Sequence, residues 1–248
     1  MNRVKVTVTL THLVKVTVTL TLLMAGGAAV ATDCVVLLHG LARTSASMSK
    51  MEEALQGEGY ATANVDYPSR DYEISELASM AVGEGLARCR ANDGLGKIHF
   101  VTHSLGGILL RQYLSTAPIA ELGRVVMLGP PNQGSRASDE LEGVPGFDWL
   151  NGPAGHQLGK GANSVPLALG PVDFELGVIA GNRSIDPITS AVLDNPDDGR
   201  VSVEDTKVEG MDDFVVVEHS HAFMMRMRLP IELTKTFLRT GRFSDTAD

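Results

Sequence analysis

Ser104 lies in a segment whose residue types and spacing are typical of a nucleophilic serine. The segment reads Thr102-His103-Ser104-Leu105-Gly106-Gly107, after an apolar run at Ile98–Val101 and before a helix-like run at Ile108–Leu114. A serine at the tip of a sharp strand-to-helix turn exposes its hydroxyl, and the next backbone N–H can stabilise a developing oxyanion. The segment therefore predicts Ser104 as a nucleophile and the N–H of Leu105 as an oxyanion donor. The alternative is an ordinary strand-to-helix turn.

The segment around Ser104 differs from the usual nucleophile pattern at one position. Strand and helix pass close together at such a turn, so the pattern G-x-S-x-G has small residues two positions before and after the serine. Gly106 fits this pattern, whereas Thr102 stands where glycine is expected. Because threonine is still small, we expect the turn to form.

A second segment offers another oxyanion donor. Val35–Leu38 is apolar throughout and ends in His39-Gly40-Leu41-Ala42. A strand that is apolar on both faces belongs in the middle of a parallel sheet covered by helices. A histidine-glycine step after such a strand can leave a backbone N–H free to face an oxyanion. We expect this donor to be Leu41, with Ala42 as the alternative, and we expect His39 to be a structural residue.

Taken together, these segments resemble the α/β-hydrolase superfamily, and within it the small bacterial lipases and esterases. The resemblance runs from about residue 34 to about residue 225. It rests on five motifs in the order typical of that superfamily: Leu38-His39-Gly40-Leu41, Thr102-His103-Ser104-Leu105-Gly106-Gly107, Gly129-Pro130-Pro131-Asn132-Gln133-Gly134-Ser135, Asp198-Gly199-Arg200-Val201-Ser202-Val203 and His219-Ser220-His221.

The resemblance implies a fold and an activity. The fold is the α/β-hydrolase fold, an α/β architecture with a mostly parallel central sheet, helices on both faces and a small lid insertion. The activity is that of a serine carboxylic-ester hydrolase, an esterase or lipase that acts through a Ser-His-Asp triad and an acyl-enzyme intermediate. An acyltransferase on the same scaffold and a non-catalytic secreted binding protein are the alternatives.

A nucleophilic serine needs a general base, which the superfamily places after the last strand. His219 and His221 both follow the last strand-like run, Phe214–Val217. His221 precedes a segment that looks like the start of the helix behind the histidine in related sequences. We therefore expect His221 to be the base, with His219 as the alternative.

The acid that orients the base is expected between the last two strands. The segment Asn195-Pro196-Asp197-Asp198-Gly199-Arg200-Val201 resembles the N-D-G-x-V segment that carries the acid in several bacterial lipases. In this alignment Asp198 takes the place of the acid. Asp-Gly is also a common turn, so Asp186 and Asp197 stay open as alternatives.

Alternating strand-like and helix-like segments should position these residues. Further strands are expected at 61–65, 125–128 and 176–180. Helices are expected at 47–56, 74–88 and 231–239, the last with Pro230 at its start. Residues 132–172 are rich in glycine, proline and asparagine and show little periodicity. Because long irregular connections are usually functional, we expect a lid or wall over the site. Trp149 either contributes apolar surface there or packs the loop down.

The first 31 residues differ from the rest of the chain. They contain three basic and no acidic residues, then an apolar stretch that ends in Ala29-Val30-Ala31. This pattern predicts a secretory signal peptide at 1–31, followed by a hydrolase domain at 32–248. The repeat of Val4–Leu10 at Val14–Leu20 leaves open an edge hairpin, or an extension before a start at Met24.

Both cysteines, Cys34 and Cys89, lie in the predicted domain. An even number of cysteines in an exported enzyme indicates a disulfide, and two buried thiols are the alternative. We therefore expect a Cys34–Cys89 disulfide and a secreted or periplasmic protein.

Composition narrows the possible partners. The chain of 248 residues has a net charge of −9, which gives no support for binding nucleic acid or anionic membranes. No metal-ligand motif or phosphate-binding glycine loop occurs in the sequence, so we expect neither a metal nor another cofactor. The expected partner is a small-molecule or lipid ester, with no stable membrane insertion after processing. The sequence indicates no oligomeric state.

Overall fold

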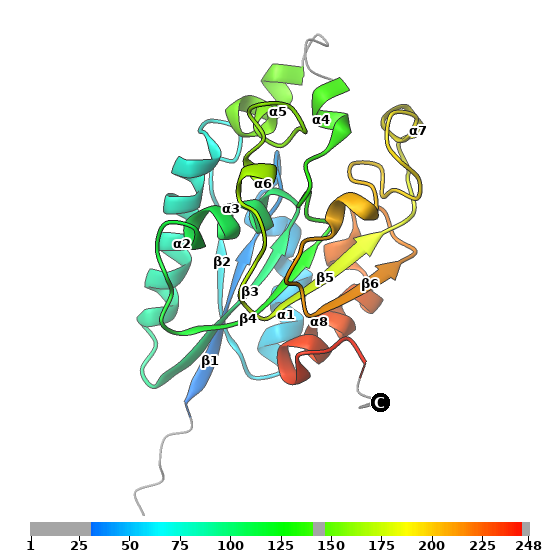
Figure 1. Cartoon of the computed structure of the whole chain (residues 1–248). Helices are drawn as coiled ribbons and strands as arrows, with labels where there is room; N and C mark the ends of the chain where they lie inside the picture. Colours follow the sequence, from blue (N-terminus) through cyan, green and yellow to red (C-terminus); the bar gives the residue numbers. More distant parts are fainter. Residues whose placement is uncertain (1–30, 141–146, 245–248) are drawn as a thin grey trace, which may run out of the picture.

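The central element of the fold is a six-stranded parallel sheet with the strand order β2-β1-β3-β4-β5-β6 (Figure 1). The computed structural model describes residues 31–140 and 147–244, except for the side chains of 147–151 and 188. The predicted signal peptide therefore lies outside the described residues, apart from its last position. The strands are β1 (Thr32–Leu38), β2 (Ala61–Val65), β3 (Leu95–His103), β4 (Leu122–Leu128), β5 (Leu176–Gly181) and β6 (Asp213–Val217).

Helices cover both faces of this sheet. One face is covered by α2 (Ile74–Arg90) and α3 (Leu105–Leu114), and the other by α1 (Ser49–Gly57) and α8 (Arg228–Thr240) (Figure 1). The remaining helices are short: η1 (Ser45–Met48), α4 (Arg136–Glu140), α5 (Phe147–His156), α6 (Val165–Ala168), α7 (Pro187–Ser190), η2 (Glu204–Thr206) and η3 (Met224–Arg226).

The two faces bury separate apolar clusters, and β1 shows how the sequence builds both. Cys34, Val36 and Leu38 belong to the cluster under α2 and α3, whereas Val35 and Leu37 belong to the cluster under α1 and α8. All five side chains are fully buried. Because side chains alternate along a strand, a strand buried on both faces must be apolar at every position. The uninterrupted apolar run therefore explains the central position of β1.

The predicted strands and the main helices all form in the structure. The last helix differs slightly at its start, because α8 begins at Arg228 and Pro230 stands within its first turn. Proline is tolerated there because the first N–H groups of a helix have no intrahelical partner. Among the described helices, none is long and apolar enough to cross a membrane.

The region predicted as a lid or wall contains three short helices, α4, α5 and α6. They lie at the end of the molecule where the parallel strands have their carboxyl ends (Figure 1). Arg111 of α3 holds this region: its guanidinium donates hydrogen bonds to the backbone oxygens of Asn132, Pro166 and Gly170. Both ends of this region, at Asn132 and at 166–170, are therefore tied to the core next to the site. The side chain of Trp149 lies outside the described residues.

Cys34 and Cys89 form the predicted disulfide, with their Cα atoms 5.7 Å apart. The bond joins β1 to α2, which packs on the same face of the sheet. Both cysteines are fully buried within that cluster.

Reduction of this disulfide is expected to lower the melting temperature without affecting the chemistry. The bond closes a loop with a sequence separation of 55 residues, for which chain entropy gives about 4 kcal/mol of stability. For a chain of this size that corresponds to a decrease of about 10 °C. Thermal unfolding with and without reductant measures the effect, and the Cys34→Ser/Cys89→Ser variant is the control. Labelling of both cysteines by an alkylating agent in unreduced, denatured protein would contradict the assignment.

Candidate active site

Ser104 stands alone between β3 and α3, in a backbone conformation that is unusual for a residue with a side chain. Its φ is 52° and its ψ is −121°. Among the described residues other than glycine, only Ser104 and Ala42 have a positive φ, and both line the same cavity. Strained residues of this kind cluster at functional sites, where the surrounding structure holds them. The predicted sharp turn is therefore present, with Ser104 at its tip.

The close approach of strand and helix explains the small residues around Ser104. A Cβ atom on Gly106 would lie 2.6 Å from the backbone oxygen of Leu38. A Cβ on Gly107 would lie 3.2 Å from Oγ1 of Thr102. Thr102 therefore fits where the usual pattern has glycine because the second glycine, Gly107, gives it room. The larger side chain at position 102 is thus accommodated by the missing side chain at Gly107, on the other side of the turn.

The loop after β1 passes close to the same turn. A Cβ on Gly40 would lie 2.7 Å from Nδ1 of His103, so glycine is required for this approach. The N–H of Ala42 donates to Oγ of Ser69 at 3.1 Å. Within the described part of the chain, the N–H of Leu41 makes no hydrogen bond. Leu105 is the first residue of α3, where backbone N–H groups have no partner within the helix. Leu41 and Leu105 are therefore the available donors, and Ala42 is engaged elsewhere.

His39 has the structural surroundings expected from the sequence. It is fully buried, and its ring stacks on that of Tyr67 with centroids 3.9 Å apart. Its Nδ1–H donates to the oxygen of Gly40 at 2.8 Å, and Nε2 accepts the N–H of Tyr67 at 3.3 Å. Burial lowers the pKa of His39, which is consistent with a neutral ring. His39 thus fixes the loop that presents Leu41.

Asp198 and His221 form a buried hydrogen-bonded pair. Nδ1 of His221 lies 2.7 Å from Oδ2 of Asp198, and the N–H of His221 also donates to the backbone oxygen of Asp198 at 2.9 Å. The second carboxylate oxygen, Oδ1, accepts the N–H groups of Arg200 at 2.9 Å and Val201 at 2.8 Å. The carboxylate is thereby held on one side by backbone donors and directed at His221 on the other.

Gly129, at the end of β4, makes room for this pair. It has a φ of +55°, and a Cβ there would lie 3.0 Å from Oδ2 of Asp198 and 3.1 Å from Nδ1 of His221. Both the backbone conformation and the lack of space therefore favour glycine at this position.

The alternative acids are used elsewhere. Asp197 accepts hydrogen bonds from Oγ of Ser190 at 2.5 Å and from the N–H of Gly199 at 2.7 Å. Asp186 accepts hydrogen bonds from the N–H and the hydroxyl of Thr189. His219, the alternative base, does not line the cavity around Ser104, whereas His221 does. The structure therefore brings Ser104, Asp198 and His221 together, and not the alternatives.

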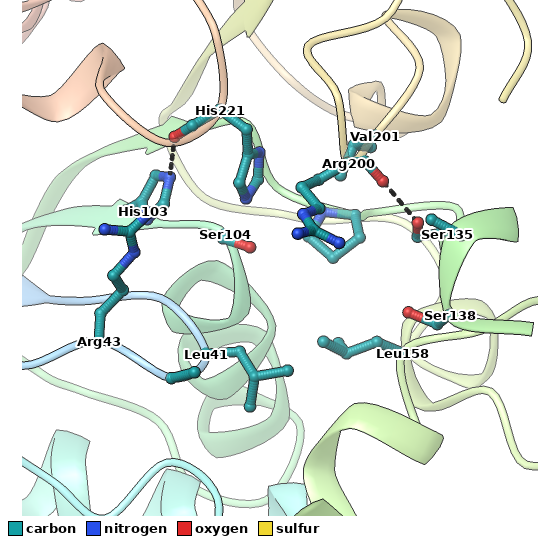
Figure 2. Close-up of a pocket in the computed structure, with 13 residues that line it drawn as sticks. Leu41, Arg43, His103, Ser104, Ser135, Ser138, Leu158, Arg200, Val201 and His221 are labelled. Carbon is teal, nitrogen blue, oxygen red and sulfur yellow. Dashed lines mark hydrogen bonds between the residues drawn. The ribbon is translucent and has the colours of Figure 1, made fainter. Parts of the chain in front are cut away.

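His103 is a site residue that the sequence reasoning did not single out. It is buried, and its Nε2–H donates to the backbone oxygen of His221 at 2.9 Å (Figure 2). Burial, with a smaller effect of neighbouring His221, holds the pKa of His103 well below its usual value. A neutral ring protonated on Nε2 fits this bond. His103 thus fixes the backbone of His221, and its position directly before Ser104 was the only sequence signal.

A cavity of about 240 Å³ opens above Ser104. Its apolar lining comes from the loop after β1, the segment after β4 and the 132–172 region, and the loop that carries Asp198. It includes Leu41, Pro131, Ala137, Leu158 and Val201. The region predicted as a lid or wall therefore contributes a wall. Arg43 and Arg200 also line the cavity, and the sequence analysis did not predict them there.

The ring of His221 lies beside Ser104 in the cavity (Figure 2). Within the described residues, the Ser104 hydroxyl makes no hydrogen bond to this ring. Such bonds are often long in enzymes without substrate and tighten when substrate binds. Among the described residues, no group of three or more His, Cys, Asp or Glu side chains could hold a metal ion.

Comparisons with known proteins bear on the family and the fold of the chain. Residues 35–231 match the model of the Alpha/beta hydrolase family. A comparison with curated protein sequences found no match.

Solved structures of lipases and esterases share the fold. The mature lipase BlEst2 of Bacillus licheniformis is 20% identical, with a TM-score of 0.70 over 85% of this chain and 92% of that chain. The phospholipase PlaB of Legionella pneumophila is 18% identical, with a TM-score of 0.63 over 85% of this chain and 57% of that chain. The metagenomic carboxyl esterase MGS0156 is 18% identical, with a TM-score of 0.58 over 78% and 65% of the two chains.

Proposed function

Because the chain belongs to the alpha/beta hydrolase family, we propose that it is a serine carboxylic-ester hydrolase with Ser104, His221 and Asp198 as its catalytic triad. The observation that carries the proposal is the 2.7 Å hydrogen bond between the buried Asp198 and His221, which lines the same cavity as the strained Ser104. A nucleophile and a base that line one cavity, with a buried acid directed at the base, are the groups that acyl transfer requires.

In the first half of the reaction, Oγ of Ser104 attacks the ester carbonyl carbon. Nε2 of His221 takes the hydroxyl proton, and the Asp198 carboxylate stabilises the resulting imidazolium through Nδ1–H. The carbonyl oxygen becomes an oxyanion, which the N–H groups of Leu41 and Leu105 stabilise. His221 then gives its proton to the departing alcohol, and an acyl-enzyme on Ser104 remains.

In the second half, water attacks the acyl-enzyme. His221 accepts a proton from the water, the same N–H groups stabilise the second oxyanion, and the acid is released from Ser104. A competing alcohol could take the place of water, which is the acyltransferase alternative. Product analysis with and without added alcohol distinguishes the two: free acid as the main product supports hydrolysis, and a new ester supports transfer.

The size of the cavity supports an esterase for short acyl chains. Its volume of about 240 Å³ is below the roughly 300–1,000 Å³ of pockets that enclose drug-sized ligands. In a series of p-nitrophenyl esters, kcat/KM is expected to be highest between acetate and butyrate and at least about tenfold lower for palmitate. Initial rates across the series, below the aggregation limit of the long esters, test this. A maximum at palmitate would instead support a lipase.

The compartment is also part of the proposal. The disulfide between Cys34 and Cys89 is consistent with an oxidising compartment. The leader-like composition of the first 31 residues supports export. We propose a secreted or periplasmic enzyme, and N-terminal sequencing of the protein recovered outside the cytoplasm tests both the compartment and the cleavage after Ala31.

A further inference from the structure

We propose that the preferred substrates are esters that carry a carboxylate or phosphate group close to the scissile bond, bound by Arg43 and Arg200. The inference rests on the proposed ester hydrolysis at Ser104 and adds the chemical class of the substrate. It starts from the charged side chains around the cavity, which the catalytic steps do not use.

Two adjoining cavities share Ala42 and Arg43. The first contains Ser104 and His221, and its lining includes Arg43 and Arg200; the second is lined by Arg43 and Arg226, among others. Within the described part of the chain, no aspartate or glutamate lines either cavity. All the formally charged side chains at this mouth are therefore arginines.

This distribution is the opposite of that in the chain as a whole. The sequence has 30 acidic and 21 basic residues and a net charge of −9. A net negative charge of this size repels anions on average. A cluster of cations at the mouth of one cavity therefore focuses the field there and raises the local concentration of anionic ligands.

Arg43 is free to bind such a ligand. Among the described residues it forms no ion pair with a carboxylate. It lies near His103, since its charge contributes to the lowered pKa of that ring. In Figure 2, Arg43 and Arg200 extend on opposite sides of Ser104. Arg43 can thus bind an anionic group of the substrate that lies close to the reacting carbonyl.

Arg200 is positioned by its own backbone. Its N–H donates to Oδ1 of Asp198 at 2.9 Å and its backbone oxygen accepts the hydroxyl of Ser135 at 2.6 Å. The side chain is 50% exposed and forms an ion pair with Asp186, in which a guanidinium nitrogen lies 3.7 Å from the carboxylate oxygen. That distance is too long for a hydrogen bond, so the guanidinium keeps donors for a ligand. Guanidinium groups bind carboxylate and phosphate well because two parallel N–H donors match two oxygens.

The proposal is tested with two pairs of substrates that differ in charge but closely match in shape. Phenyl hemisuccinate carries a carboxylate on the acyl side, and phenyl butyrate lacks it. In the second pair, 4-acetoxybenzoate carries a carboxylate on the alcohol side, and 4-acetoxybenzamide has a neutral amide in its place. For each pair the ratio of kcat/KM, anionic over neutral, is measured for the wild type and the Arg43→Gln/Arg200→Gln variant.

At least one pair is expected to give a ratio about tenfold higher in the wild type than in the double variant, since half-exposed ion pairs each contribute a few-fold. The difference should shrink as salt is raised above about 0.1 M, where screening acts within about 10 Å. The pair that responds identifies the side of the ester that carries the anion. Arg88→Gln is the matched control, because Arg88 is also 50% exposed, lies outside the cavity and should keep the wild-type ratio.

Equal ratios in the wild type and the double variant, for both pairs, would overturn the proposal. So would a loss of the preference in Arg88→Gln as large as in the double variant. Hydrolysis of all four esters with no charge preference leaves the proposed esterase function standing and removes only the anionic substrate class. Absence of hydrolysis of any of them, by folded wild-type protein, counts against the esterase function itself.

Discussion

Replacing Ser104 with alanine is expected to reduce kcat for ester hydrolysis by about 10⁵–10⁶-fold, because the acyl-enzyme can no longer form. The remaining rate would come from substrate binding and from the N–H groups of Leu41 and Leu105. Steady-state hydrolysis of p-nitrophenyl butyrate measures the loss. A fluorophosphonate probe gives a second readout, since it should label the wild type at Ser104 and leave the variant unlabelled.

The fold of the Ser104→Ala variant should be intact. Alanine has about the same size and the same cost at the positive φ of this position as serine, so the melting temperature should stay within a few degrees of that of the wild type. Ser138→Ala is a matched control, because this serine also lines the cavity and has no part in the proposed mechanism. Undiminished hydrolysis by folded Ser104→Ala protein would refute the assignment of Ser104.

The middle of the sheet was predictable from the sequence because its central strands are buried on both faces. A residue run such as Val35–Leu38 has no solvated face and so admits few interpretations other than a central parallel strand. The turn at Ser104 was predictable for a related reason, since a strand, a small-residue turn and a helix occur in immediate succession. In both places local pattern and tertiary structure favour the same conformation.

The wall of the cavity was less predictable. The helices α4, α5 and α6 are short, and α5 contains Pro153 and a kink at Gly152 with φ 61°. Such segments carry too few turns to show a helical period. They form because tertiary contacts hold them, as Arg111 does through the backbone of the surrounding loop. The sequence could therefore indicate the presence of a wall but not its helices.

Residues that act through loops were also beyond sequence reasoning. Arg43 and Arg200 are separated by more than half the chain, and only the paths of two loops bring them to one cavity. The role of Gly107 in accommodating Thr102 likewise depends on a contact across the turn. The motif places these positions near the site, but their contacts are set by the fold.

The choice of the acid illustrates the same limit and leads to a second large expected effect. The sequence favoured Asp198 by resemblance but left Asp186 and Asp197 open, and the hydrogen bonds in the structure separate the three. Asp198 directs Oδ2 at Nδ1 of His221, at 2.7 Å. Asp197 and Asp186 direct their oxygens at Ser190, Gly199 and Thr189 instead. We therefore expect substitution of Asp198, and not of the other two, to impair catalysis.

Asp198→Asn is expected to lower kcat by about 10⁴-fold. The amide oxygen of the asparagine can keep the hydrogen bonds from the N–H groups of Arg200 and Val201, which turns its NH₂ group toward His221. Nδ1 of His221 must then accept a hydrogen bond, so the proton moves to Nε2. In that tautomer the imidazole has no lone pair on Nε2 to take the proton from Ser104. The fold is preserved while the base is lost.

The matched controls are Asp197→Asn and Asp186→Asn. Loss of the hydrogen bonds to Ser190 or Thr189 should cost stability, on the order of 1 kcal/mol each, while kcat changes little. Measuring kcat and the melting temperature for all three variants separates the catalytic from the structural carboxylates. If Asp186→Asn or Asp197→Asn loses activity by orders of magnitude and Asp198→Asn does not, the acid has been assigned to the wrong residue. The pairing of Asp198 with His221 would then be only a structural hydrogen bond.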